Sequence, residues 1–239
     1  MSLADFLELL LLAAVWGASF LFMRIAAPEI GPVWLIETRV LLAGLALLLV
    51  SARLNLLNQI RSKFIPLFVV GCINSAIPFL LFAFASLYLS AGFNGILNAT
   101  APLFGTIIAF FWLKEKFTLN RIVGFAIGFA GVIVLVGLAN QPTDRSFILA
   151  ASGGLLAALM YAIASIYIKQ NLSEVTPLVI ATGSQLSAAI LTVTYLIPLF
   201  AAVWGALVLA EPITRSMALG CGLILLGTAI AAEIFSPSK

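Results

Sequence analysis

The chain has 239 residues, of which 63% are hydrophobic and only 9% are charged, with a net charge of +3. A soluble domain carries about 25% charged residues, so this composition excludes a water-soluble globule and indicates a protein surrounded by lipid. The small, scattered net charge gives no support for a nucleic-acid partner. Histidine is absent and neither Cys72 nor Cys221 lies in a Cys-x-x-Cys pattern, so the sequence predicts no metal site and no cofactor.

Long apolar stretches follow one another along the chain, and a membrane-spanning helix needs about 20 such residues. The first charges, Asp5 and Glu8, are acidic, whereas a signal peptide opens with positive charge, so we expect the first stretch to be a retained helix. The predicted spans are residues 7–27, 33–51, 64–88, 92–113, 120–138, 147–168 and 217–234. The sequence therefore predicts an all-α, polytopic transmembrane helix bundle.

A further uncharged run covers residues 175–210. As one straight helix it would be about 54 Å long, whereas the hydrocarbon core is about 30 Å thick. We expect a single crossing, strongly tilted or broken between Thr192 and Pro198, which brings the total to about eight helices.

Lysine and arginine are unevenly distributed between the two sides of the predicted membrane. With the N-terminus in the cytoplasm, the outer segments hold only Arg145 and Arg215. The cytoplasmic segments hold Arg53, Arg61, Lys63, Lys114, Lys116, Arg121, Lys169 and Lys239. The positive-inside rule therefore predicts a bacterial inner-membrane protein with both termini in the cytoplasm.

The chain contains an internal repeat that is visible in its rarer residue types. A shift of 145 residues pairs Trp16 with Tyr161, Arg24 with Lys169, and Glu29 to Pro32 with Glu174 to Pro177. A shift of 96 residues pairs Pro102 with Pro198, Glu115 with Glu211, Thr118 with Thr214, Gly124 with Gly220 and Gly131 with Gly227. We therefore expect a first repeat at residues 1–140 and a second at residues 141–239.

Five helices in the first repeat place the second repeat upside down in the membrane, a frequent plan among secondary transporters. The two shifts differ by 145 − 96 = 49 residues, so the second repeat lacks counterparts of about residues 48–96. The repeat thus follows a ten-helix plan with about eight helices present, either because the protein is a shortened relative of a ten-helix protein or because about 49 residues are missing from this chain.

The repeat resembles the EamA-like domain of the drug/metabolite transporter superfamily, present twice. The resemblance lies in the order and spacing of short motifs over nearly the whole chain. They are Trp16 to Phe20, Glu37 to Gly44, Asn98 to Phe104, Leu113 to Glu115, Gly124 to Gly131, Pro198 to Phe200, Leu209 to Glu211 and Gly220 to Gly227. The resemblance implies a ten-helix exporter or importer of metabolites such as amino acids or other small organic solutes.

Two kinds of residue are candidates for binding a solute. Arg39 lies within a span, where a charge is costly and usually functional, although it could also snorkel to the interface. Trp16 and Tyr161 are repeat mates that could line a cavity or simply pack between the repeats. Glu37 is expected at the interface, with proton coupling as the alternative.

The candidate amides are Asn74, Asn94 and Asn98. Asn94 and Asn98 are four residues apart and share a helix face, so they could bind a solute together or join helices. Asn74 precedes Pro78, which should bend its helix, as transporters do near binding sites. Within residues 122–138, Gly124, Gly128 and Gly131 predict close helix packing, with a homodimer as the alternative.

The sequence favours a secondary transporter, most simply an exporter, of a small organic solute. The chain has no GxxxxGK[ST] loop, so ATP-driven transport is unsupported. An intramembrane enzyme is disfavoured, because the acids are dispersed and histidine is absent. A transport-inactive shortened family member, acting as a membrane scaffold or a remnant, is the second hypothesis.

Overall fold

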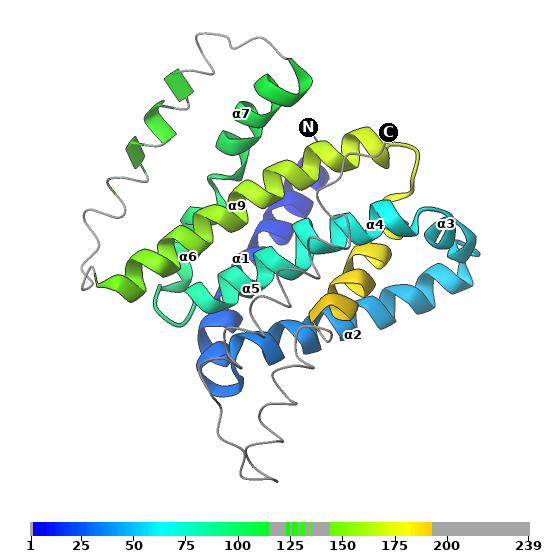
Figure 1. The fold of residues 1–239 in the computed structure, drawn as a ribbon, viewed down its shortest axis with the longest axis horizontal. Helices are drawn as coiled ribbons and strands as arrows, with labels where there is room; N and C mark the ends of the chain where they lie inside the picture. The colour runs from blue at the N-terminus through cyan, green and yellow to red at the C-terminus, as the bar shows by residue number, and fades with distance from the viewer. Residues whose placement is uncertain are drawn as a thin grey trace, which may run out of the picture.

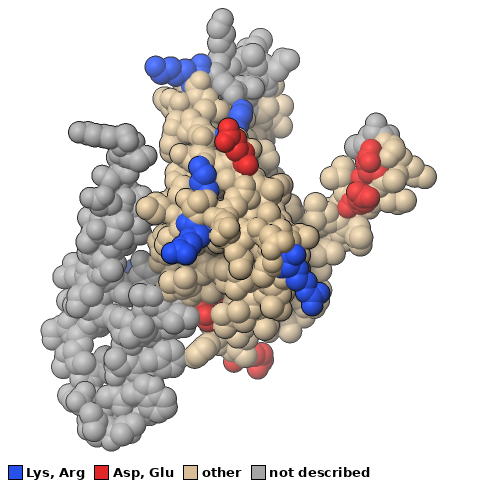
Figure 2. Space-filling view, turned by 90° about the vertical axis from the view of Figure 1, so that its right-hand side faces the viewer, with Lys and Arg blue, Asp and Glu red and all other residues tan. Residues whose placement is uncertain are grey.

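The computed structural model describes residues 2–114 and 144–192, together with residues 123, 124, 126–128, 130, 131 and 134. Within these residues the regular secondary structure is entirely helical, and five segments are long and apolar enough to cross a membrane. Most of the described surface seen in Figure 2 is neither acidic nor basic. The described part is therefore a helical membrane bundle, as the sequence predicts.

The first two spans form a hairpin. Helix α1 (Leu3–Ile30) begins with a capping box, in which Ser2 and Asp5 each accept a hydrogen bond from the other's backbone N–H. It ends at Gly31, whose φ of 82° suits glycine, and α2 (Pro32–Arg53) starts with a proline in its first turn.

The next two spans are each interrupted. After the short helix α3 (Leu57–Ser62), the third span consists of α4 (Phe64–Val70), the π-helix η1 (Gly71–Ala76) and α5 (Ile77–Ala85). The fourth span consists of α6 (Ala91–Asn98) and α7 (Ala101–Leu113). The predicted ends of all five spans lie within four residues of the observed ends, the largest difference being 7 against 3 at the start of α1.

The next described span, α9 (Arg145–Asn171), packs along α5, α6 and α7 (Figure 1). Its N-cap is Asp144, whose side chain accepts a hydrogen bond from the backbone N–H of Phe147 at 2.8 Å. Small residues dominate its buried face, which lets neighbouring backbones approach closely. They are Ala150, Ala151, Gly154, Ala157, Ala158, Ala162 and Ala164.

A shorter apolar helix, Pro177–Thr192, lies antiparallel to α2. Glu37 near the start of α2 accepts a hydrogen bond from Thr192, and Ser51 near its end bonds Thr182 at 2.8 Å. Gly71 of η1 also meets this helix, because a Cβ added there would lie 2.4 Å from the Cβ of Ser187. The helix is thus held against both α2 and η1.

One sequence expectation for this region is wrong. Glu37 does not face the interface: its side chain is only 4% exposed, because the helix Pro177–Thr192 covers it. The expected spans at 120–138 and 217–234 and the expected break between Thr192 and Pro198 fall largely or wholly outside the described residues. Within the first of these, Gly128 approaches the side chain of Leu103 in α7, which is packing inside the chain.

Candidate functional site

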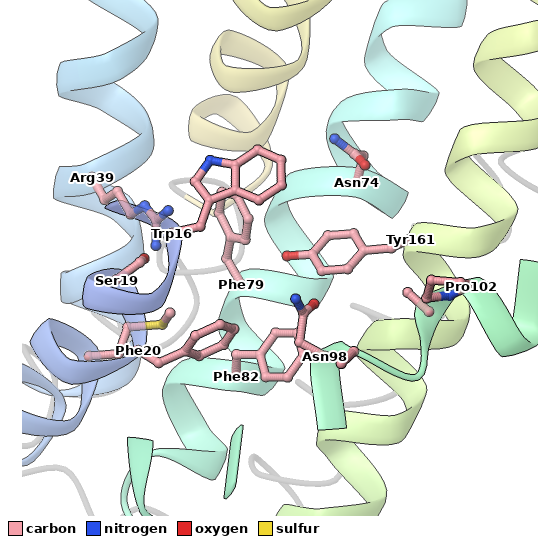
Figure 3. A pocket seen from close by; sticks show the side chains of 13 residues that line it. Trp16, Ser19, Phe20, Arg39, Asn74, Phe79, Phe82, Asn98, Pro102 and Tyr161 are labelled. Atoms are coloured by element: carbon pink, nitrogen blue, oxygen red, sulfur yellow. The ribbon is translucent and has the colours of Figure 1, made fainter. Parts of the chain in front are cut away.

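A central pocket of about 530 Å³ lies among α1, α2, the third and fourth spans and α9 (Figure 3). Solute pockets in proteins occupy about 300–1,000 Å³, so its size suits a small organic molecule. The lining residues are mostly aromatic or apolar, with a few polar side chains among them. They are Trp16, Ser19, Phe20, Met23, Arg39, Asn74, Phe79, Phe82, Asn98, Ala99, Ala101, Pro102 and Tyr161.

The third span brings two of these residues to the pocket through its π-helix. The backbone N–H of Ile77 bonds the carbonyl of Cys72, five residues back, so this turn contains one extra residue. Pro78 has no N–H to continue the regular pattern. Asn74 and Phe79, on either side of this change of register, both line the pocket.

The fourth span contributes its break. The chain leaves α6 at Asn98 and enters α7 at Ala101, with Pro102 in the first turn of α7. Asn98, Ala99, Ala101 and Pro102 all line the pocket. Irregular backbone at membrane depth is tolerated where it borders a cavity, and interrupted helices commonly mark the solute site of a transporter.

Three polar side chains of the pocket keep their hydrogen-bonding groups unused within the described residues. Arg39, Asn74 and Asn98 make no side-chain hydrogen bond within the part of the chain that the structure describes. The guanidinium carbon of Arg39 instead lies 4.6 Å from the centre of the Phe79 ring. Figure 3 shows Arg39 at the left of the labelled side chains, Asn74 at the upper right and Asn98 below their centre. One cation and two carboxamides are therefore available to a solute.

Aromatic rings form the rest of the wall. Phe82 packs edge-on against Phe20 with ring centres 5.3 Å apart, and it stacks with Tyr161 at 6.1 Å. In Figure 3 the hydroxyl of Tyr161 points from α9 into the space between the labelled side chains. Trp16 on α1 completes the wall although 65% of its side chain is exposed. These surfaces suit an apolar or aromatic solute body.

The structure thus brings together five of the six predicted site residues: Trp16, Arg39, Asn74, Asn98 and Tyr161. Asn94 does not line the pocket. It is fully buried and donates to the Ser86 hydroxyl at 2.9 Å, which ties α6 to the end of α5. The Ser86 carbonyl in turn accepts a 2.6 Å hydrogen bond from Arg24 of α1. Asn94 therefore belongs to a network that joins three helices.

Sequence reasoning missed Phe20, Phe79, Phe82 and Pro102 as lining residues. Phenylalanine is common in this chain, so its identity alone gave no signal. Pro102, ten residues into the predicted span 92–113, could have predicted the break between α6 and α7. Among the described residues, no group of histidine, cysteine, aspartate and glutamate could hold a metal ion.

A helical membrane bundle with a pocket between interrupted helices is an architecture that secondary transporters use. The sequence model of the EamA-like transporter family matches residues 6–137, which is more than half of the chain, and the chain belongs to this family.

The chain is also similar to curated proteins. It is 20% identical over 162 residues to the uncharacterized transporter YoaV of Bacillus subtilis, covering 67% of this chain and 56% of that one. It is 28% identical over 138 residues to the protein PagO of Salmonella typhimurium, covering 57% and 44%. It is 26% identical over 148 residues to a protein of Streptantibioticus cattleyicolor named as a probable terminal-alkyne amino-acid exporter, covering 60% and 50%.

The aligned regions make up between 41% and 63% of the lengths of the curated relatives. No solved structure matches the chain. The matching family is described as a transporter family, and several of the similar proteins are named as transporters.

Proposed function

We propose that the protein is a secondary transporter that exports a small organic solute, such as an amino acid, and binds it in the central pocket. The observation that carries the proposal is the pocket itself, in which Arg39, Asn74 and Asn98 have free polar groups beside aromatic walls. The relative from Streptantibioticus cattleyicolor, named as a probable terminal-alkyne amino-acid exporter, supports this class of solute.

The depth of the pocket along its helices supports a transport role. Trp16 lies near the middle of α1 and Tyr161 near the middle of α9, so we propose that the pocket lies close to the bilayer midplane. Secondary transporters hold solute at this depth and expose it alternately to the two sides. We propose that a solute or ion gradient drives this movement.

We further propose an inner-membrane location with both termini in the cytoplasm, on the distribution of lysine and arginine. Reporter fusions after Lys63 and Arg121 should be cytoplasmic, and a fusion after Gln141 should be external. A cytoplasmic reporter after Gln141 would reverse the proposed orientation.

A flux assay tests the transport proposal. Full-length protein in liposomes loaded with a panel of radiolabelled amino acids should release at least one of them faster than empty liposomes. Arg39→Ala should abolish that release while the variant still inserts and purifies. Arg39→Lys should weaken the release, because lysine lacks the planar fork of N–H donors that the guanidinium provides. Release by Arg39→Ala at the wild-type rate would remove Arg39 from the site.

A transport-inactive membrane scaffold or remnant is the second candidate, because the second repeat lacks counterparts of about residues 48–96. This candidate predicts protein that inserts stably but moves no solute. Absence of flux across a broad metabolite panel, with stable insertion, would favour it over the transporter.

A further inference from the structure

The contact between Arg39 and Phe79 sets the position of the cation seen by a solute. The guanidinium lies 4.6 Å from the ring centre, and both side chains line the central pocket. We propose that Phe79 is a positioning residue that holds the Arg39 guanidinium so that it binds a carboxylate of the solute. This inference rests on the proposed function, because it names the chemical class recognised in the same pocket.

The π-helix explains why a phenylalanine at position 79 reaches this place. In a regular α-helix, residues five apart point about 140° away from each other. The extra residue in the π turn removes much of this angle, so Asn74 and Phe79 both face the pocket. Gly71 and Ser75 fix this turn, because Gly71 packs on Ser187 and the Ser75 hydroxyl accepts from Gln185 at 3.3 Å.

A ring is an unusual partner with a useful consequence. The Phe79 ring attracts the guanidinium through its face and accepts no hydrogen bond from the N–H groups in the guanidinium plane. A carboxylate partner would accept hydrogen bonds from these N–H groups. Within the described residues, Arg39 has no hydrogen bond and no ion pair. The planar fork is therefore held in place with its donors free, which is the geometry that binds a carboxylate through two parallel hydrogen bonds.

The surroundings of Arg39 add to this preference. Every other polar group that lines the described pocket is neutral: the hydroxyls of Ser19 and Tyr161, the indole of Trp16 and the amides of Asn74 and Asn98. Glu37, two residues from Arg39, is buried and bonded to Thr192. A solute carboxylate is thus the partner that would neutralise the positive charge of Arg39.

Matched pairs of small molecules test the inference on the full-length chain in lipid nanodiscs. The probes are 3-phenylpropanoate, 4-methylpentanoate and L-phenylalanine, each with its primary-amide analogue. Binding is measured by titration calorimetry. The wild-type protein should bind at least one carboxylate about tenfold more tightly than its amide, because the amide forfeits the charge-assisted pair.

Substitutions of Phe79 then separate positioning from packing. Phe79→Leu removes the ring at similar volume and should weaken carboxylate binding about fivefold more than it weakens amide binding. Phe79→Tyr keeps the ring and should restore the preference. Phe82→Leu is the matched control, because it removes a ring of the same pocket and should weaken both analogues equally. In an Arg39→Gln background, Phe79→Leu should have no further effect on the ratio.

Three results would overturn the inference: no carboxylate binds to the wild type, carboxylate and amide bind equally, or Phe79→Leu weakens both to the same extent. Flux of a neutral solute with no carboxylate preference would leave the proposed function standing and remove this inference. Carboxylate binding that depends on Arg39 and Phe79, without any flux, would leave this inference standing and remove the proposed function. Amide binding by each variant reports that its pocket is folded.

Discussion

Helices α1 and α9 are mates in the predicted repeat, yet their surroundings differ. In the most apolar stretch of each helix, 50% of the residues are buried in α9, whereas only 6% are buried in α1. Helix α9 packs on α5, α6 and α7, whereas α1 contacts α2, α5 and α6 along its C-terminal half. The residue types differ accordingly. The buried residues of α9 are mainly alanine and glycine, whereas α1 exposes leucines such as Leu7 and Leu11.

The repeat offers a physical reason for the difference. The groove that holds α9 is built largely by the third and fourth spans of the first repeat. The corresponding groove for α1 would come from the counterparts of about residues 48–96, which the predicted second repeat lacks. Neighbouring helices therefore hold α9, which contributes Tyr161 to the pocket wall. Trp16, by contrast, lines the pocket from α1, which is largely exposed.

Helix α2 and its mate, the helix Pro177–Thr192, behave differently and contact each other in a symmetric way. Thr192 donates to Glu37, and Thr182 lies 3.5 Å from the carbonyl oxygen of Leu47. The shift of 145 residues pairs Glu37 with Thr182 (37 + 145 = 182) and Leu47 with Thr192 (47 + 145 = 192). The shift therefore relates one contact to the other. Here both partners are present in the chain, and each buries the other.

The largest expected effect tests the difference between α1 and α9 directly. Ala158 is fully buried, and its repeat mate Ala13 is exposed. Ala158→Leu should destabilise the protein by about 1–3 kcal/mol, because the extra volume has no space, whereas Ala13→Leu should be neutral. Unfolding is followed by labelling of the buried Cys72 thiol in a Cys221→Ser background. Equal losses would show that α1 is packed as tightly as α9.

The symmetric pair of helices provides the second prediction. Thr192→Val removes the described partner of the Glu37 carboxyl group, whose other oxygen already has none. Leaving a buried polar group unsatisfied costs about 1–3 kcal/mol, measured by the same thiol labelling. The double variant Glu37→Leu/Thr192→Val should lose less than the sum of the two single variants. Additive losses would mean that the two side chains do not interact.

The third prediction compares the aromatic mates that line the pocket. Tyr161→Leu should lose about 1 kcal/mol of stability, because its ring stacks on Phe82. Trp16→Leu should keep its stability, because Trp16 is 65% exposed. Both variants should bind solute more weakly in the titrations described above. A loss of stability in Trp16→Leu would show that α1 is supported by more than its described contacts.

The spans could be predicted from the sequence because twenty apolar residues in a row have few alternatives in a membrane. Arg39, Asn74 and Asn98 could be predicted because polar groups inside such stretches are costly and therefore informative. Asn94 was equally polar, and sequence could not tell that the nearby Ser86 hydroxyl would accept its hydrogen bond.

The remainder depends on three-dimensional register. Phe79 reaches Arg39 only because the π turn inserts one residue before it, and no residue type encodes that insertion unambiguously. Glu37 appeared to be an interfacial acid because only the fold brings Thr192, 155 residues away, against it. Local periodicity predicts which residues share a helix face, and it cannot show which distant helix will cover that face.

The smallest expected effect concerns the other contact between α2 and its mate. Thr182 bonds Ser51 at 2.8 Å and also donates to the Leu178 carbonyl within its own helix. Thr182→Val keeps the shape and removes the bond between helices, and such bonds contribute about 0.6 kcal/mol on average in membrane bundles. Because Leu178 retains its helical N–H partner and Ser51 can turn to a backbone carbonyl, we expect a loss below that of Thr192→Val. The thiol-labelling assay should rank Thr192→Val below Thr182→Val in stability, with Ser51→Ala close to Thr182→Val. The reverse ranking would mean that the Ser51 contact, rather than the Glu37 contact, holds the two mates together.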